Sequence, residues 1–353
     1  MERKVKLFLW LTAIGVLSYI FKLTMDHQLW LKAQGSDIMW SIFRLRNNES
    51  GFAESYPRDI TDSSHLLGVF KGLSKVTCEP VRSKTSPWFV KLFNTSIQPF
   101  MSPLSQGIVR EEFDWWKRLQ RNHITYEAFL DFLTEMDKVL PHSQLLFKEK
   151  RHNCTSCAVV GNSQNLEGSG LGKAIDCHDY VFRMNRGPVE GYENDVGTFT
   201  THRFMYPESA TKIPSGTGLI FIPFKMGDLK WLNNTLTKVS NEKRNIISTE
   251  RKKVIVYNPA FIHYVHNVWG EKKGRYPSTG FLAVIFVLHS CDEVDLFGFG
   301  QDSHGAWPHY WDKKYQGQWR KGRVHNGDHE GEMLQRLKDN GIIRIFKKQD
   351  SKT

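Results

Sequence analysis

Residues 157–172 read CAVVGNSQNLEGSGLG, a short apolar run followed by a glycine-rich segment. The four residues from Cys157 to Val160 predict a short buried strand that ends in a turn at Gly161. A glycine-rich turn after a strand can bring backbone N–H groups close to a phosphate. The pattern is neither G-x-G-x-x-G nor G-x-x-x-x-G-K-[ST], so it gives no support to dinucleotide-binding or P-loop proteins. A flexible surface loop is the alternative interpretation.

Similar apolar runs alternate with helical patterns along the rest of the chain. This alternation predicts an α/β domain whose mostly parallel sheet has helices on both faces. In such sheets, ligands bind beyond the carboxyl ends of the strands. Further strands are expected at 180–184, 219–222, 253–257, 293–298 and 342–346, with one or two amphipathic helices in 113–140, a buried helix at 279–290 and a polar helix at 330–340.

Polar residues follow several of these strands. Asn162, Ser163 and Asn165 come after the first strand, and their amide and hydroxyl groups suit a ribose or a base edge. Asn185 follows the strand at 180–184, whereas Asn258 precedes a proline and is better explained as a turn residue. The segment Tyr276-Pro-Ser-Thr-Gly280 leads into the buried helix. Its Ser278 can be a helix N-cap only, or the helix N-terminus can also receive an anion.

Two further clusters contain histidine: HYWD at 309–312 and VHNGDHE at 324–330. His325 lies in a polar loop just before a helix, and an ordinary histidine pKa near 6.5 suits a general base. His325 and His329 have the i, i+4 spacing of a zinc pair, but no Glu follows His325 and Gly327 argues against a helix there. No Asp-x-Asp occurs in the chain, so we expect histidine, tyrosine, lysine or helix dipoles to neutralise any phosphate leaving group, and no metal.

The composition indicates a globular protein with acidic ligands. Its 353 residues are 40% hydrophobic and 24% charged, which excludes wholesale disorder, and the formal net charge is +11. The positive charge favours anionic partners such as a phosphate-bearing substrate, although no concentrated basic tract supports nucleic-acid binding.

The N-terminal segment predicts a membrane anchor. Residues 7–21 (LFLWLTAIGVLSYIF) carry no charge and follow Arg3, Lys4 and Lys6, so the N-terminus is expected in the cytosol. We therefore expect a cytosolic tail at 1–6, a transmembrane signal anchor at 7–23, a luminal stem at 24–75 and a luminal catalytic domain at 76–353. A cleaved signal peptide is the alternative, but no small-x-small site follows.

The oxidising lumen affects how five cysteines and four sequons are interpreted. Cys154-x-x-Cys157 has the spacing of half a zinc site or of a redox pair, but nothing completes four zinc ligands, so disulfides are favoured. The sequons at Asn48, Asn94 and Asn233 become candidate glycosylation sites. Asn153 adjoins Cys154 and is the weakest candidate.

Taken together, these segments resemble the animal sialyltransferases of glycosyltransferase family 29. Residues 157–206 resemble the large sialyl motif of that family, 277–300 the small motif, HYWD at 309–312 motif III, and His325 with Glu330 the very small motif. The flanking sequence, such as WWKRLQ at 115–120, is most similar to the β-galactoside α2,3-sialyltransferases acting on Galβ1-3GalNAc. The resemblance covers roughly residues 78–346.

This resemblance implies a Rossmann-like, GT-A-variant fold behind a single N-terminal transmembrane helix, in a type II Golgi membrane protein. It also implies an inverting, metal-independent transfer of sialic acid from CMP-N-acetylneuraminate, with no cofactor. The acceptor would be the galactose 3-hydroxyl of Galβ1-3GalNAc in O-glycans and glycolipids. The alternatives are an α2,3-sialyltransferase that prefers Galβ1-4GlcNAc and a catalytically weak carbohydrate-binding relative.

The resemblance also assigns roles by motif position. His325 would be the general base and His309 would contact the departing phosphate. The implied disulfides are Cys157–Cys291 and Cys78–Cys154, which leaves Cys177 as a thiol. Donor-binding roles fall on Asn162, Ser163, Asn185, Ser278, Thr279, Gly280 and Gly300, and acceptor-binding roles on Gln120, Tyr206 and Tyr276.

Overall fold

The structure is a computed structural model, and its described residues belong to one compact unit of the chain. The tail, anchor and stem expected at 1–75 lie outside the described residues, as do Cys78, Asn48 and Asn153. Within the described part, no helix has both the length and the apolar character needed to cross a bilayer. The described residues are 80–101, 108–120, 123–140, 154–237, 247, 249–301, 308–312 and 324–348.

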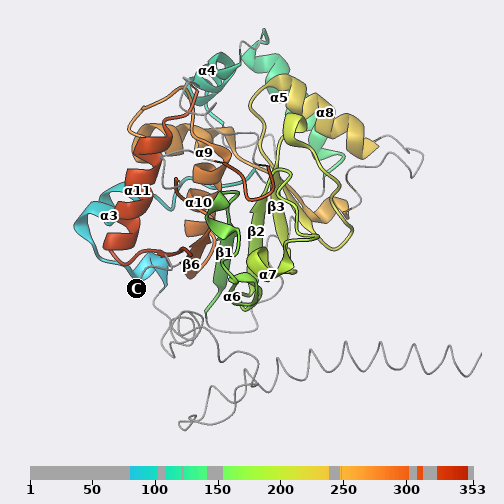
Figure 1. Ribbon diagram of the computed structural model, residues 1–353. Helices are drawn as coiled ribbons and strands as arrows, with labels where there is room; N and C mark the ends of the chain where they lie inside the picture. Colours follow the sequence, from blue (N-terminus) through green and yellow to red (C-terminus); the bar gives the residue numbers. More distant parts are fainter. Residues whose placement is uncertain are drawn as a thin grey trace, which may run out of the picture. The chain divides into compact units, whose positions relative to one another are not determined.

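A parallel sheet forms the centre of this unit, as the alternation of apolar strands and helices predicted (Figure 1). Seven strands lie in the order β5-β4-β3-β2-β1-β6-β7, and every neighbouring pair is parallel. The chain runs outward from β1 to β5 and then returns to add β6 and β7 on the other side of β1. The strand order therefore reverses between β1 and β6, which is where such sheets bind ligands. The strands are β1 (Ser156–Val160), β2 (Tyr180–Met184), β3 (His202–Met205), β4 (Gly218–Phe221), β5 (Val254–Val256), β6 (Glu293–Phe297) and β7 (Arg344–Phe346).

Side chains that cap the helix ends explain where several helices begin. Thr125 accepts a hydrogen bond from the Ala128 N–H at 3.2 Å, and Asn258, as expected of a turn residue, accepts from the Ala260 N–H at 3.0 Å. The α-helices are α3 (Pro87–Leu92), α4 (Arg110–Leu119), α5 (Tyr126–Asp137), α6 (Gly172–Asp176), α7 (Glu193–Val196), α8 (Met226–Thr237), α9 (Pro259–Tyr264), α10 (Thr279–Leu288) and α11 (Gly327–Asp339). The shorter helical turns are η2 (Val81–Ser83), η3 (Gln164–Leu166), η4 (Pro207–Ser209), η6 (Arg251–Lys253) and the π-helix η7 (Val265–Trp269).

Both faces of the sheet are buried. On one face, Phe182 and Leu296 belong to the larger core, which α10 covers by contacting β1, β2 and β6. On the opposite face, Ala158 and Val181 belong to a smaller core with residues of α6 and α7. Strands enclosed on both sides read as nearly continuous apolar runs, which is why most of them are visible in the sequence.

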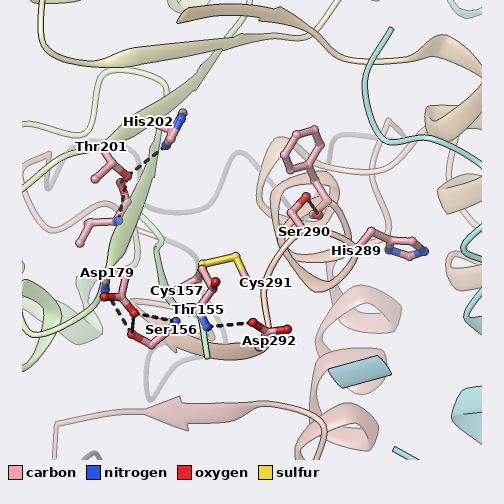
Figure 2. Close-up of a disulfide and its surroundings, with 12 residues drawn as sticks. Thr155, Ser156, Cys157, Asp179, Thr201, His202, His289, Ser290, Cys291 and Asp292 are labelled. Carbon is pink, nitrogen blue, oxygen red and sulfur yellow. Dashed lines mark hydrogen bonds between the residues drawn. A yellow bond between two sulfur atoms is a disulfide. The ribbon is translucent and has the colours of Figure 1, made fainter. Parts of the chain in front are cut away.

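A disulfide ties the amino end of β1 to the residues before β6 (Figure 2). It joins Cys157 to Cys291, the bridge that the family resemblance implies, across 134 residues of sequence. Beside it, the Thr155 N–H donates to the Asp292 carboxylate at 2.8 Å. Cys154 is also disulfide-bonded, and its expected partner Cys78 lies outside the described residues. Cys177 retains its thiol, which donates to the Lys173 carbonyl at 3.2 Å.

Candidate active site

Close backbone contacts fix the turn after β1. The Gly161 N–H donates to the Phe297 carbonyl at 2.7 Å, and the Ser163 N–H donates to the Gly298 carbonyl at 3.0 Å. A Cβ at position 161 would lie 2.3 Å from the Gly298 oxygen, so only glycine permits this approach. These contacts place Asn162 and Ser163 at the carboxyl edge of the sheet, where the strand order reverses, and they oppose the flexible-loop alternative.

The segment that follows β6 and the HYWD segment join this turn. The Ser163 hydroxyl donates to the Gly300 carbonyl at 2.8 Å, and Gly300 has a φ of 120° that favours glycine. Ser163 pairs with His309 in an isolated antiparallel bridge, and the Tyr310 N–H donates to the Asn162 carbonyl at 3.1 Å. Asn162, Ser163, Gly300 and His309, which the sequence places far apart, therefore lie together.

The His309 ring is partly shielded from water. It stacks on Trp311 with ring centroids 4.4 Å apart and planes 9° from parallel. Burial lowers the His309 pKa below its ordinary value, and the nearby Asp312 carboxylate opposes that effect. The lowered pKa favours the neutral form of the ring, which can donate one hydrogen bond.

Asn185 connects the predicted donor residues to the predicted acceptor residues. Its backbone is left-handed, with a φ of 52°, a conformation that Asn adopts more readily than most residues. The Ser209 hydroxyl lies 2.8 Å from Asn185 Oδ1 and accepts the Tyr206 N–H at 3.3 Å. The ends of β2 and β3 are thus held together through Ser209.

Ser278 caps α10, as both interpretations of its sequence predicted. Its Oγ accepts the Phe281 N–H at 3.1 Å, and its own N–H and hydroxyl donate to the Glu330 carboxylate at 2.8 and 2.5 Å. Burial raises the pKa of Glu330 to about 7, and the hydrogen bonds from Ser278 act in the opposite direction. Sequence reasoning placed Glu330 in a motif but gave it no role.

The first turn of α10, which contains the predicted donor residues Thr279 and Gly280, lies over the ends of two strands. A Cβ at Gly280 would be 3.5 Å from the Phe299 ring, after β6, and 3.7 Å from the Met184 sulfur, in β2. The N-terminus of this ten-residue helix therefore faces the same edge of the sheet as Asn185 and Gly300.

His325 is oriented by a backbone carbonyl. Its Nδ1 lies 2.8 Å from the Tyr276 oxygen, and because a carbonyl only accepts, Nδ1 carries the proton and the neutral ring has its lone pair on Nε2. Burial lowers the His325 pKa, and the hydrogen bond to Tyr276 opposes that shift. His325 lies in the loop before α11, as expected, and so does not share a helical turn with His329. The helix itself begins at Gly327, three residues before the predicted start at 330. The cap at Asn326, which accepts the His329 N–H, explains this start.

The three predicted acceptor residues gather around Phe224. The Phe224 ring lies 5.0 Å from that of Tyr276 and 5.7 Å from that of Tyr206, measured between centroids. Gln120, at the end of α4, has its Nε2 3.5 Å from the Tyr276 hydroxyl. The edge of the Tyr276 ring also meets His325 at 5.1 Å, so this aromatic cluster adjoins the proposed base.

Sequence reasoning missed Phe224 and Lys225, which follow β4. Lys225 Nζ donates to Gln120 Oε1 at 3.1 Å, forms an ion pair with Glu208 and lies 3.4 Å from Asp228. The position of Phe224 and Lys225 after the strand β4 was the available signal, but the sequence there contains no polar cluster that would have indicated a site.

The described residues give two further observations. They contain no group of three His, Cys, Asp or Glu side chains placed to hold a metal ion. Asn94 is exposed, and its Oδ1 accepts from the N–H and hydroxyl of Ser96, whereas Asn233 is half-buried within α8.

Comparison with known proteins identifies the family. The sequence model of glycosyltransferase family 29 (sialyltransferase) matches residues 102–342. The chain is 42% identical over 292 residues to the Sus scrofa CMP-N-acetylneuraminate-beta-galactosamide-alpha-2,3-sialyltransferase 1, covering 79% of this chain and 85% of that protein. It is 38% identical over 292 residues to the Rattus norvegicus CMP-N-acetylneuraminate-beta-galactosamide-alpha-2,3-sialyltransferase 2, covering 79% and 82%.

Solved structures agree with the sequence matches. A crystal structure of a mammalian sialyltransferase in complex with Gal-beta-1-3GalNAc-ortho-nitrophenol superimposes with a TM-score of 0.69 at 41% identity, covering 78% of this chain and 99% of that chain. The match over the sheet, the helices and the site motifs leads to one conclusion: this chain belongs to glycosyltransferase family 29, the sialyltransferases.

Proposed function

We propose that this α2,3-sialyltransferase transfers sialic acid from CMP-N-acetylneuraminate to the 3-hydroxyl of galactose in Galβ1-3GalNAc, with inversion and without a metal. The acceptor proposal is supported by the solved relative that carries a Gal-beta-1-3GalNAc compound and by the gathering of Gln120, Tyr206 and Tyr276 in this chain. We further propose a Golgi location, a type II anchor at 7–23, a stem at 24–75 and glycosylation at Asn94, Asn48 and Asn233.

The carboxyl edge of the sheet is the proposed donor site. Its groups are amides, hydroxyls and backbone N–H groups, which suit a nucleotide, and the N-terminus of α10 adds a partial positive charge. His309 would stabilise the CMP that departs. The proposed donor-binding residues are Asn162, Ser163, Asn185, Ser278, Thr279, Gly280 and Gly300.

The proposed reaction needs one base. His325 Nε2 removes the proton from the galactose 3-hydroxyl as that oxygen attacks the anomeric carbon of sialic acid from the face opposite the phosphate. The bond to the CMP oxygen breaks, and its electron pair leaves with CMP. A general base of this kind contributes about 10²–10⁴-fold to a rate, and the rest comes from positioning and electrostatics.

One observation carries this assignment. Tyr276 holds the base through its backbone carbonyl and contacts Gln120 through its hydroxyl. The base and the proposed acceptor residues are therefore joined by a single residue, which supports the proposal that His325 Nε2 accepts the proton of the galactose hydroxyl.

The test uses the full chain in detergent micelles, with CMP-N-acetylneuraminate and EDTA. Galβ1-3GalNAc and Galβ1-4GlcNAc are offered together, and product linkage and CMP release are measured. We expect transfer to the 3-hydroxyl of Galβ1-3GalNAc, undiminished by EDTA, and a loss of about 10²–10⁴-fold in kcat for His325→Gln.

The possible contrary results are distinct. Preference for Galβ1-4GlcNAc would refute the acceptor proposal, and loss of activity in EDTA would refute metal independence. Unchanged kcat in His325→Gln would exclude it as the base. A wild-type protein that binds CMP and acceptor without transfer would favour the carbohydrate-binding alternative.

A further inference from the structure

Two buried arginines lie side by side near the carboxyl end of the sheet. Arg183 in β2 and Arg203 in β3 are register partners, so their side chains leave the same face of the sheet. They are only 2% and 8% exposed. Two like charges on adjacent strands repel each other, and burial adds a desolvation cost for each.

Neutral oxygens surround both guanidinium groups. Arg183 donates to Thr200 Oγ1 at 2.8 Å and to the Val196 and Phe199 carbonyls at 2.7 and 2.9 Å. Arg203 donates to the Asn185 and Gly187 carbonyls at 2.8 and 3.1 Å. These bonds cancel no charge, and Arg183 Nη1 is buried without a hydrogen-bond partner among the described residues.

No carboxylate among the described residues forms an ion pair with either arginine. Asp176 acts on Arg183 at longer range, while its own oxygens accept from Thr198 and Phe199. Desolvation lowers the pKa of Arg183 to about 10 and also lowers that of Arg203, so both remain cationic at neutral pH. Within the described part of the chain, these two buried positive charges therefore have no carboxylate bonded to them.

Arg203 holds the loop 185–188, which begins with the proposed donor residue Asn185 and approaches another, Asn162. One of its acceptors is the carbonyl of Asn185, the residue with left-handed backbone. The other belongs to Gly187, where an added Cβ would lie 2.7 Å from Asn162 Oδ1. Tyr310 closes the group, because its hydroxyl donates to the Pro188 carbonyl at 2.5 Å and its N–H to the Asn162 carbonyl.

We propose that Arg183 and Arg203 are positioning residues of the donor site, and that their uncompensated charge makes the site selective for the anionic part of its ligand. Arg203 fixes loop 185–188 between Asn162 and Asn185, and the pair supplies the positive potential that a metal ion supplies in other nucleotide-sugar enzymes. This inference rests on the proposed donor site and does not depend on the acceptor. The ligand class is a nucleoside monophosphate or its sugar ester.

The test compares CMP with cytidine, which lacks the phosphate. Dissociation constants for both are measured by calorimetry on the full chain in detergent, for the wild type, Arg203→Met, Arg203→Gln and Arg203→Lys. We expect the two neutral variants to weaken CMP binding about tenfold and cytidine binding less than about threefold. Arg203→Lys retains the charge, but its ammonium lacks the planar guanidinium from which Nη1 reaches both carbonyls, so it should weaken both ligands slightly and keep the wild-type ratio.

Arg344→Lys is the matched control, because Arg344 lies in the same sheet but is paired with Asp295. Its two dissociation constants should stay within about twofold of the wild type. Thermal unfolding identifies variants that fail to fold, and Arg203→Gln provides a second neutral side chain that can still donate to a carbonyl. Equal weakening of CMP and cytidine in the neutral variants, or no weakening, would overturn the proposal. A wild type that binds CMP but does not sialylate Galβ1-3GalNAc would refute the proposed acceptor and leave this inference standing.

Discussion

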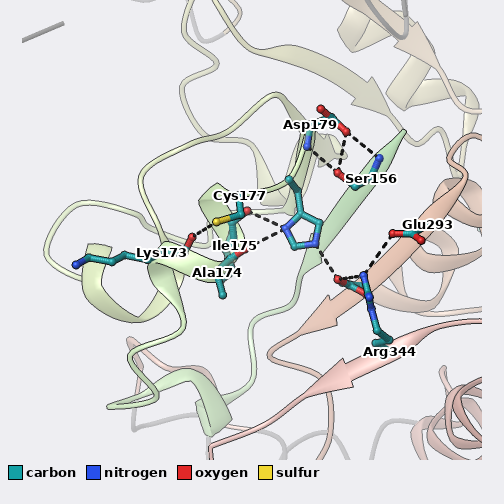
Figure 3. Close-up of polar contacts among 10 residues, drawn as sticks. Ser156, Lys173, Ala174, Ile175, Cys177, Asp179, Glu293 and Arg344 are labelled. Carbon is teal, nitrogen blue, oxygen red and sulfur yellow. Dashed lines mark hydrogen bonds and ion pairs between the residues drawn. The ribbon is translucent and has the colours of Figure 1, made fainter. Parts of the chain in front are cut away.

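Two charged clusters, each built on buried side chains, lie on the same face of the sheet, and they differ in how their charge is balanced. In the amino half, Arg344 donates to both oxygens of Asp295 at 2.6 and 2.8 Å, with Glu293 3.6 Å away (Figure 3). His178 Nε2 lies 2.9 Å from the same carboxylate, while its Nδ1 faces the carbonyls of Ala174 and Ile175 at 3.1 Å. The His178 ring therefore links the carboxylate of Asp295 to the backbone carbonyls before β2.

In the amino-half cluster the cation Arg344 therefore has carboxylate partners of its own, Asp295 and Glu293, without a ligand. In the carboxyl half, the acceptors that the described residues offer Arg183 and Arg203 are all neutral. A balanced buried cluster contributes to the integrity of the fold, because removing one member leaves the others unpaired. An unbalanced one gains its counter-charge when an anionic ligand binds. If the proposal is correct, one half of the sheet serves stability and the other serves recognition of the donor.

The largest expected effect comes from breaking the balanced cluster. Asp295→Asn leaves Arg344 and His178 without their shared carboxylate, which should lower the free energy of unfolding by about 3–5 kcal/mol. CMP affinity at a temperature where the variant is folded should stay within about twofold of the wild type. Urea denaturation measures the first quantity and calorimetry the second. If Asp295→Asn instead lost CMP affinity and kept the stability of the wild type, the amino-half cluster would serve ligand binding rather than stability, and the comparison would be wrong.

The next effect concerns Glu330, a buried glutamate at the carboxyl edge of the sheet. Burial raises the pKa of its side chain from 4.5 to about 7. The folded state holds this proton more tightly than the unfolded state, so its contribution to stability is present below pH 4.5 and is lost as the pH rises through 7. The loss amounts to about 3 kcal/mol. Glu330→Gln removes this group from titration, so the free energy of unfolding of the variant relative to the wild type should rise by that amount between pH 4.5 and pH 7.5.

Urea denaturation at those two pH values measures the difference. The glutamine side chain of the variant keeps a carbonyl to accept the Ser278 N–H but loses the second acceptor. We therefore expect this loss to change the free energy of unfolding by the same amount at both pH values. Only the change between the two pH values tests the prediction. The same pH dependence in the variant and the wild type would show that Glu330 does not titrate in this range. The Glu330 carboxylate would then be a stable buried anion. The carboxyl edge would contain a negative charge of its own, contrary to the comparison.

Much of the fold is visible in the sequence because parallel strands buried on both faces are continuously apolar. The strand at 180–184 has the predicted bounds, and β1 and β6 differ from prediction by one residue. β3 was missed, because His202 and Arg203 interrupt its apolar run, although both are buried. The pattern at 113–140 is two helices, since Thr125 caps a second one.

The site was predicted less completely, because a sequence motif identifies residues but does not show which groups they contact. The positions after strands led to Asn162, Ser163 and Asn185. They did not reveal that Tyr276 presents its carbonyl to His325, or that Arg183 and Arg203 face each other, because those relations depend on register and on backbone direction. A charged residue inside an otherwise apolar strand is the signal that could have indicated the arginines.

The smallest expected effect concerns Lys225, a cation at the carboxyl edge that does have carboxylate partners. Its Nζ donates to Gln120 Oε1, which turns the amide Nε2 toward the Tyr276 hydroxyl, so Lys225→Met should loosen an acceptor contact and leave the donor site unchanged. Because Lys225 is partly exposed, we expect about 1 kcal/mol, or about a fivefold rise in the acceptor KM with an unchanged donor KM. Glu208→Gln is the control, since it removes the ion-pair partner of Lys225 but not its bond to Gln120. If the donor KM rises instead, Lys225 acts on the nucleotide even though carboxylates balance its charge. Charge balance would then not distinguish the residues that recognise the donor from those that recognise the acceptor.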